Sequence, residues 1–220
     1  MRAPTLIQLL CLRCLLGMSL GLFGSASIQA AGFRITDQSG SPVNGAVVSF
    51  EPLDQSPPAT VPQLINVGQE GLRFAPHVSV IRAGDQVNFP NRDPVRHHIY
   101  SFSEARPLEI KLYSGLPAAP LDFPRPGVVV LGCNIHDWML GFIVVLDTPW
   151  WQISDQQGRT TDPEIPAGRY RVRVWHSQLP TPAQSWEQEL VFPLEQEQSA
   201  QLVLGDAPDL TPPDLGLGSR

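Results

Sequence analysis

One seven-residue loop, Cys133 to Met139, constrains the fold more than any other stretch, because it lies between two long apolar segments. Those segments, residues 127–132 and 140–146, are rich in Val, Ile and Leu and have the length of buried strands. The loop therefore connects two core strands, and it holds a thiol, the imidazole of His136 and a thioether. Soft sulfur suits Cu(I), and imidazole suits both oxidation states of copper. The loop predicts one part of a copper site, with a second imidazole supplied from elsewhere.

Residues 1–30 have the pattern of a secretory signal peptide. Arg2 gives a basic start, residues 6–23 are mostly apolar, and residues 25–31 are small enough for cleavage near Ala30. A signal anchor that stays in the membrane is the alternative, although the apolar run is shorter than the ~20 residues that a span needs. We expect the mature protein to be periplasmic, with no membrane span after signal removal.

Removal of this segment changes which sulfur groups remain. Cys11 and Cys14 would leave with it, so that Cys133 becomes the sole thiol and Met139 the sole methionine of the mature chain. A lone exposed thiol tends to oxidise or cross-link in an oxidising compartment, whereas coordination to a metal protects it. The alternative is a buried structural cysteine beside a core methionine, which leaves the imidazole between them unexplained.

Composition favours an all-β protein. The chain contains 23 Pro and 18 Gly together with short β-branched runs, and no heptad or amphipathic helix pattern stands out. Its formal net charge is −6, and no basic cluster is present. We therefore expect a β-sandwich without a nucleic-acid partner.

Strand patterns separated by turn signals run along the whole chain. Asp37 to Gly40 carries turn-forming residues, and the Pro-rich stretch 52–62 is expected to be a surface loop. The expected strands are 33–36, 42–50, 78–81, 86–89, 98–102, 127–132, 140–146, 169–175, 189–192 and 200–204.

A polar loop, residues 90–97, delivers a histidine to the start of a strand. Alternation places His97 on the same face as Ile99, and His98 on the opposite face with Tyr100 and Phe102. Both faces carry apolar residues, so the pattern leaves open which of them is the core face.

The stretch from Phe89-Pro90-Asn91 to His97, followed by Cys133, His136 and Met139, resembles the cupredoxin family, the small blue-copper fold of plastocyanin and amicyanin. It is also similar to bacterial cupredoxin-like proteins labelled as methylamine utilisation proteins, a label that records a genomic association. The resemblance covers about residues 71–148 and implies a Greek-key β-sandwich.

The resemblance also implies a ligand set. His97, Cys133 and His136 would surround one type 1 copper ion, with Met139 as a long axial ligand. His98 stands where plastocyanin and amicyanin carry an Asn, so His98 either replaces His97 or supports it.

The segments that flank this region, 31–55 and 150–205, resemble a carboxypeptidase regulatory-like β-sandwich. They contain two D-x-x-G turns, at Asp37 and Asp155, and a P-A-G-x-Y sequence at residues 166–170. We therefore expect the two flanks to pair into one additional small β-sandwich, with the cupredoxin inserted between its strands. Residues 206–220 are expected to form a disordered tail.

Three function classes follow from these residues. The leading one is a periplasmic electron carrier, not an enzyme, that meets redox protein partners transiently. The second is a copper-binding or delivery protein without an electron-transfer role, and the third is a structural or binding module. A zinc hydrolase fits least, because no carboxylate lies at a ligand spacing and Met is a poor zinc ligand.

Four residues outside the ligand set also carry expectations. Asn91 is expected to order the first ligand loop, and Trp138 either covers the copper or packs in the ordinary way. His77 and His176 are expected at the surface.

Overall fold

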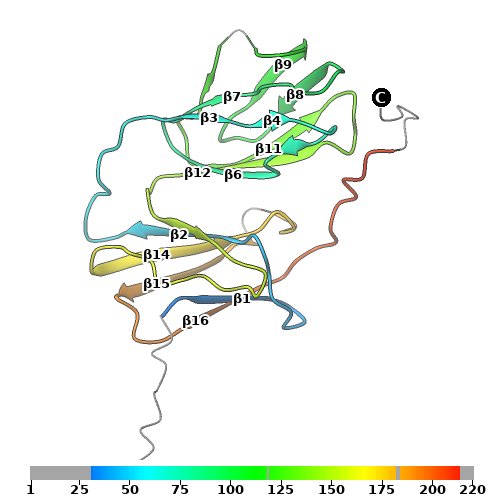
Figure 1. The fold of residues 1–220 in the computed structure, drawn as a ribbon. Coiled ribbons are helices and arrows are strands. Elements are labelled where there is room, and N and C mark those ends of the chain that lie inside the picture. The colour runs from blue at the N-terminus through cyan, green and yellow to red at the C-terminus, as the bar shows by residue number, and fades with distance from the viewer. Residues whose placement is uncertain (1–30, 118, 182–183, 214–220) are drawn as a thin grey trace, which may run out of the picture.

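The computed structural model describes residues 31–117, 119–181 and 184–213. These residues form sixteen β-strands, and among them no helix is long and apolar enough to cross a membrane. In Figure 1 the strands form an upper half and a lower half, one above the other. The predicted all-β sandwich class is therefore confirmed. The predicted signal peptide lies outside the described residues, as do residues 214–220 of the predicted tail.

The upper half of Figure 1 contains a three-stranded and a five-stranded sheet. The first has the order β10-β7-β3 and the second the order β6-β12-β11-β8-β9, so that neighbours in space are often distant in sequence. The strands are β3 (Leu64–Asn66), β6 (Val78–Arg82), β7 (Gln86–Asn88), β8 (His97–Ser101), β9 (Leu108–Tyr113), β10 (Leu121–Asp122), β11 (Gly127–Cys133) and β12 (Leu140–Leu146). A short ribbon of β4 (Gly68–Gln69) and β5 (Phe74–Ala75) joins them at one side.

A hydrophobic core fills the space between these two sheets. Phe89 and Phe123 come from the side of the smaller sheet, and Ile99, Leu131 and Ile143 come from the larger one. All five are at most 1 % exposed. Burial of this apolar surface is the main stabilising contribution to the upper half.

Strand β12 is buried on both faces, which explains its uninterrupted apolar sequence. Ile143 and Val145 face the upper core, whereas Phe142 and Val144 pack with Val47 against the lower layers. The predicted strand 140–146 is thus confirmed with the same bounds, and it joins the upper and lower halves of the molecule.

The two lower layers are built from segments at both ends of the described chain. A four-stranded sheet has the order β13-β2-β14-β15, and a two-stranded sheet pairs β1 with β16. The strands are β1 (Phe33–Asp37), β2 (Val47–Pro52), β13 (Trp151–Ile153), β14 (Gly168–Trp175), β15 (Trp186–Phe192) and β16 (Gln198–Leu202).

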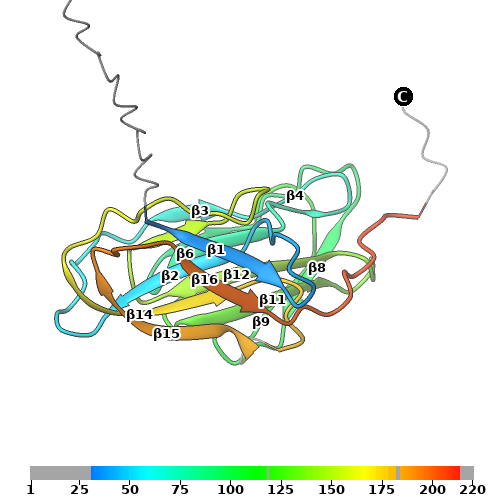
Figure 2. The ribbon, with the colours of Figure 1, turned by 90° about the horizontal axis from the view of Figure 1, so that it is seen from below.

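Long-range pairing holds these lower strands together. Strand β2 runs antiparallel to β14, with Phe50 opposite Val172, and β1 runs parallel to β16, with Ile35 opposite Ala200. Figure 2 shows β1 and β16 side by side, in front of β2, β14 and β15. The chain leaves these layers after β2 and returns to them at β13.

Some strand predictions need correction. The strand expected over 42–50 begins only at Val47, because the chain turns at Gly45, whose φ is 80°. Strand β16 begins and ends two residues earlier than expected, and β9 was not predicted. The β9 sequence does alternate between apolar and charged residues, but none of its residues is more than half-buried.

His77 and His176, which were expected at the surface, are half-buried near the junction of the two halves. His77 Nδ1 lies 3.1 Å from the Leu140 carbonyl oxygen, and its ring packs edge-on against Phe142. His176 Nε2 lies 3.1 Å from the Asn44 carbonyl oxygen.

Candidate metal centre

The ligand-bearing loop begins where strand β11 ends. Cys133 is the last residue of that strand and pairs with Ile99 of β8. The His136 amide donates to the Cys133 carbonyl over 3.4 Å, and the Met139 amide donates to the His136 carbonyl over 2.9 Å. Two successive tight turns therefore explain the spacing of three residues between these side chains. The Asn134 amide, which donates to the His98 carbonyl over 3.0 Å, fixes the loop to β8.

The second imidazole comes from the start of β8. The pairing of β8 with β9 shifts register between His97 and Ile99, where two residues of β9, Lys111 and Leu112, lie opposite His98. β8 itself keeps a regular alternation of buried and half-buried residues. His97, Ile99 and Ser101 are buried on the core face, which settles the question that alternation left open.

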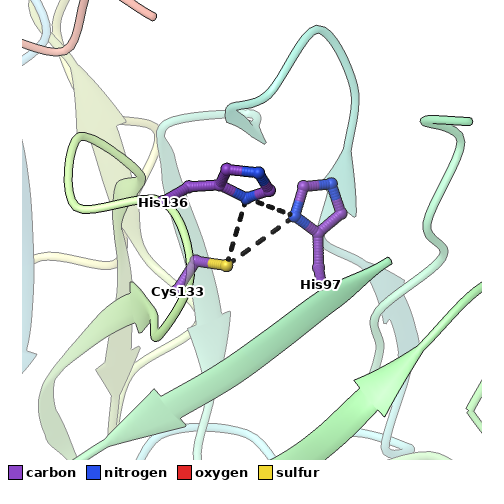
Figure 3. Close-up of side chains that lie close together, drawn as sticks. All are labelled: His97, Cys133 and His136. Carbon is purple, nitrogen blue, oxygen red and sulfur yellow. Dashed lines mark hydrogen bonds between the residues drawn. The ribbon is translucent and has the colours of Figure 1, made fainter. Parts of the chain in front are cut away.

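Three donor atoms from these segments face one another, as Figure 3 shows. Cys133 Sγ lies 3.7 Å from His97 Nδ1 and 3.5 Å from His136 Nδ1, and the two ring nitrogens are 3.2 Å apart. The structure thus brings together three of the four predicted ligands. It places Met139 at the end of the same loop, 2 % exposed and in the same core cluster as Cys133.

The size of this triangle suits a metal ion. A circle through the three atoms has a radius of about 2.0 Å, close to the ~2.0–2.3 Å bonds that Zn²⁺ forms with imidazole nitrogen and thiolate sulfur. One thiolate and two imidazoles are also the trigonal donor set of electron-transfer copper sites. The residues therefore fit copper in donor type and in spacing.

The three side chains are shielded from solvent. His97 is 0 % exposed, Cys133 3 % and His136 8 %. Only the His136 edge of the cluster approaches the surface, so a bound ion would be reached from that side.

A carboxylate holds His97 in place. Asp93 Oδ2 lies 2.8 Å from His97 Nε2, and the Asp93 side chain is only 7 % exposed. With the Nε2 proton donated to this carboxylate, a neutral His97 carries its lone pair on Nδ1, toward Cys133.

Asn91 orders the same loop. Its side-chain amide donates to the Val95 and Tyr113 carbonyls over 2.8 and 3.2 Å, and its Oδ1 accepts the Asp93 amide over 2.9 Å. These hydrogen bonds agree with the expected role of Asn91.

Trp138 lies against the other imidazole. Its ring centroid is 5.1 Å from that of His136, and its indole N–H donates to the Leu72 carbonyl over 3.2 Å. Trp138 is half-buried and also packs against the upper core. It therefore covers one side of His136 and packs in the core at the same time.

The charges of the cluster are coupled. Burial alone would lower the pKa of His97, but hydrogen bonds to Cys133 and Asp93 raise it above its ordinary value. Burial alone would raise the pKa of Cys133, but the hydrogen bond with His97 lowers it. Burial and the nearby His97 lower the pKa of His136. In the metal-free protein His97 and Cys133 therefore each favour the charged form of the other, and the lowered pKa of His136 favours its neutral form.

His98 points away from the cluster. Its Nε2 lies 3.1 Å from Glu109 Oε1 in an exposed pair, and its side chain is 19 % exposed. It contributes no donor atom to the group of His97, Cys133 and His136.

Asp93 and Leu72 are the site residues that sequence reasoning missed. Leu72 could not be recognised from its side chain, because it acts through its backbone amide and carbonyl. Asp93 did carry a signal in the sequence, because it is an acidic residue four positions before a ligand candidate, in a loop that must reach the metal.

No protein-family model matches this chain, and no curated protein matches it. Among solved structures, a copper-containing nitrite reductase from Thermus scotoductus SA-01 is 26% identical with a TM-score of 0.36; the match covers 44% of this chain and 25% of that one. The chain thus spans about a quarter of the nitrite reductase.

Two smaller proteins are matched over nearly their whole length. A purple cupredoxin from Nitrosopumilus maritimus is 20% identical with a TM-score of 0.32, over 38% of this chain and 98% of that one. A reduced mutant form of amicyanin is 19% identical with a TM-score of 0.34, over 47% of this chain and 100% of that one.

Proposed function

We propose that this protein is a type 1 copper protein that carries electrons between redox partners. One copper ion per chain would be held by His97, Cys133 and His136, with Met139 as the axial ligand. The observation that carries the proposal is the buried triangle of one sulfur and two ring nitrogens, with the spacing that a single metal ion requires.

The chain's own residues support fast electron transfer. His97 and Cys133 lie at strand ends, and His136 is held between two tight turns, so that the donor atoms have little freedom to move. Copper, when bound, supplies a one-electron couple whose potential depends on its axial ligand and the surroundings of the cysteine sulfur. Because the three side chains are at most 8 % exposed, the site favours electron transfer over substrate binding at the metal. We therefore propose a carrier and not an enzyme.

The remaining parts of the proposal rest on the sequence. The ligand pattern favours the cupredoxin family and its methylamine utilisation group, and the flanking segments favour a carboxypeptidase regulatory-like sandwich. The N-terminal pattern favours export to the periplasm. Contacts with redox partners would be small and transient, as is usual for electron-transfer encounters.

Visible and EPR spectra during titration with Cu(II) test the proposal. The mature protein is expected to bind one copper ion and to develop an intense thiolate charge-transfer band. Cys133→Ser and His97→Ala are expected to lose the band. His98→Ala is the matched control, because it removes an adjacent imidazole that lies outside the cluster, and it is expected to keep the band.

Redox cycling separates the carrier from the delivery protein. The bound copper is expected to be reduced and reoxidised repeatedly without loss of the ion. Copper binding without the charge-transfer band, or loss of the ion on reduction, would contradict the carrier and favour a delivery role.

A further inference from the structure

Asp93 makes more contacts than the support of one histidine needs. Besides His97, its carboxylate accepts the Gly71 amide at Oδ1 over 2.7 Å and the Leu72 amide at Oδ2 over 3.1 Å. The Asp93 carboxylate is nearly buried, and these three N–H groups satisfy most of its hydrogen-bond acceptor positions. The loop before β8 is thereby fixed to the turn at residues 71–72.

The same turn holds the other ligand loop. The Leu72 carbonyl accepts the indole N–H of Trp138, whose ring lies on His136. Leu72 has a φ of 57°, which is uncommon for a residue with a side chain. Such a conformation persists where the surroundings hold it, and here Leu72 is held by its amide on one side and its carbonyl on the other.

The contacts form one continuous path from His97 through Asp93, Leu72 and Trp138 to His136. The two imidazoles, which come from segments 39 residues apart, are thus braced by a single carboxylate.

We propose that Asp93 is a positioning residue for the metal centre, an inference that rests on the proposed function. Its carboxylate fixes the His97 ring with Nδ1 toward Cys133 and, through Leu72 and Trp138, restrains His136. Its negative charge stabilises the more positive, oxidised ion in a site of low dielectric constant. Asp93 therefore keeps the reduction potential lower than the three ligand side chains and Met139 alone would set it.

Two variants of Asp93 and one control test this role. Asp93→Asn removes the charge but keeps one oxygen that can accept from His97, whereas Asp93→Ala removes both. Glu109→Gln is the matched control, because Glu109 is also paired with a histidine, His98, but outside the cluster.

The first measurement needs no metal. The indole N–H of Trp138 is expected to exchange with solvent at least tenfold faster in metal-free Asp93→Ala than in the unchanged protein. NMR resolves this signal, which is assigned by its loss in Trp138→Phe. Glu109→Gln is expected to leave the rate unchanged. An unchanged rate in Asp93→Ala would show that the path through Leu72 does not restrain the loop.

The second measurement is the reduction potential of the copper-loaded protein. Asp93→Asn is expected to raise it by at least the equivalent of a tenfold change in the oxidised-to-reduced ratio, about 59 mV for one electron. Removal of the brace is also expected to weaken Cu(I) binding by roughly 10–100-fold in Asp93→Ala. A purely structural role would not move the potential of a variant that keeps its charge-transfer band.

The proposed function and the role of Asp93 can be refuted separately. If the unchanged protein lacks the charge-transfer band, the proposed function is wrong, while the exchange measurement still decides whether Asp93 restrains the Trp138 loop. If the band is present but Asp93→Asn shifts the potential no more than Glu109→Gln does, the role of Asp93 is refuted. If Asp93→Ala does not fold, Asp93→Asn decides both measurements.

Discussion

The two D-x-x-G turns of the flanking segments provide a matched pair of glycines for a stability test. In each turn one aspartate oxygen accepts two backbone amides, and the glycine amide donates to the aspartate carbonyl over 2.9–3.0 Å. Gly40 has a φ of 85° and Gly158 a φ of 70°. The turns differ in their surroundings, because Gly40 is exposed and Gly158 is buried against β1.

We predict that Gly158→Ala is much more destabilising than Gly40→Ala. A Cβ in the left-handed region costs ~1–2 kcal/mol, and the stiffer unfolded chain returns ~0.4–1 kcal/mol, so Gly40→Ala should cost about 1 kcal/mol. A Cβ on Gly40 meets no atom within 4 Å.

At Gly158 the same Cβ would fall on the Ile35 carbonyl oxygen and lie 3.0 Å from the Val43 amide nitrogen. The backbone must move, which disrupts the hydrogen bond from the Ile35 amide to the Gly158 carbonyl and adds ~1–3 kcal/mol. The total of about 2–4 kcal/mol corresponds to a fall in Tm of roughly 5–15 °C for a protein of this size.

Thermal unfolding followed by circular dichroism measures the difference. Equal losses of stability in the two variants would refute the reasoning, because they would show that contact with β1 adds nothing to the strain of the turn.

Three further predictions concern the core and the thiol. Phe123→Ala is expected to lower the free energy of unfolding by roughly 3–5 kcal/mol. Phe102→Ala, at an 89 % exposed side chain, should change the same quantity by less than ~0.5 kcal/mol. Equal effects of the two variants in chemical denaturation would contradict the placement of the upper core. Ser154→Ala is expected to cost ~1–3 kcal/mol in the same assay, because the buried hydroxyl bonds two backbone groups, and a neutral result would argue against those bonds. Alkylation of Cys133 in the metal-free protein is expected to show a pH midpoint below that of an ordinary thiol, because the hydrogen bond with His97 lowers the pKa of Cys133. The midpoint should rise in His97→Ala. An unchanged midpoint would mean that His97 does not stabilise the thiolate.

Much of the upper half could be predicted from local sequence. Residues 127–132 and 140–146 are apolar over a length that only a buried strand explains, and the structure places β11 and β12 there as an antiparallel pair. The start of β2 is fixed by its pairing with β14, far along the chain. β9 pairs with the preceding strand β8 and alternates apolar and charged residues, so a local signal for it was present in the sequence.

The sequence by itself determined the all-β class and the chemical nature of the site, because strand periodicity and ligand type are properties of the residues themselves. It placed a thiol, an imidazole and a thioether in one loop and narrowed the second imidazole to His97 or His98.

Only the tertiary structure shows which of those two histidines faces Cys133. The face of β8 that carries His97 and Ile99 turns out to be the core face, which brings His97 to Cys133 and leaves His98 beside Glu109. The position of Asp93 before His97 was a signal in the sequence, but its contact with Leu72, more than twenty residues earlier, appears only in the tertiary structure. Both depend on contacts between residues distant in sequence, and the direction of a side chain at such a contact is set by the packed fold and not by its neighbours in the chain.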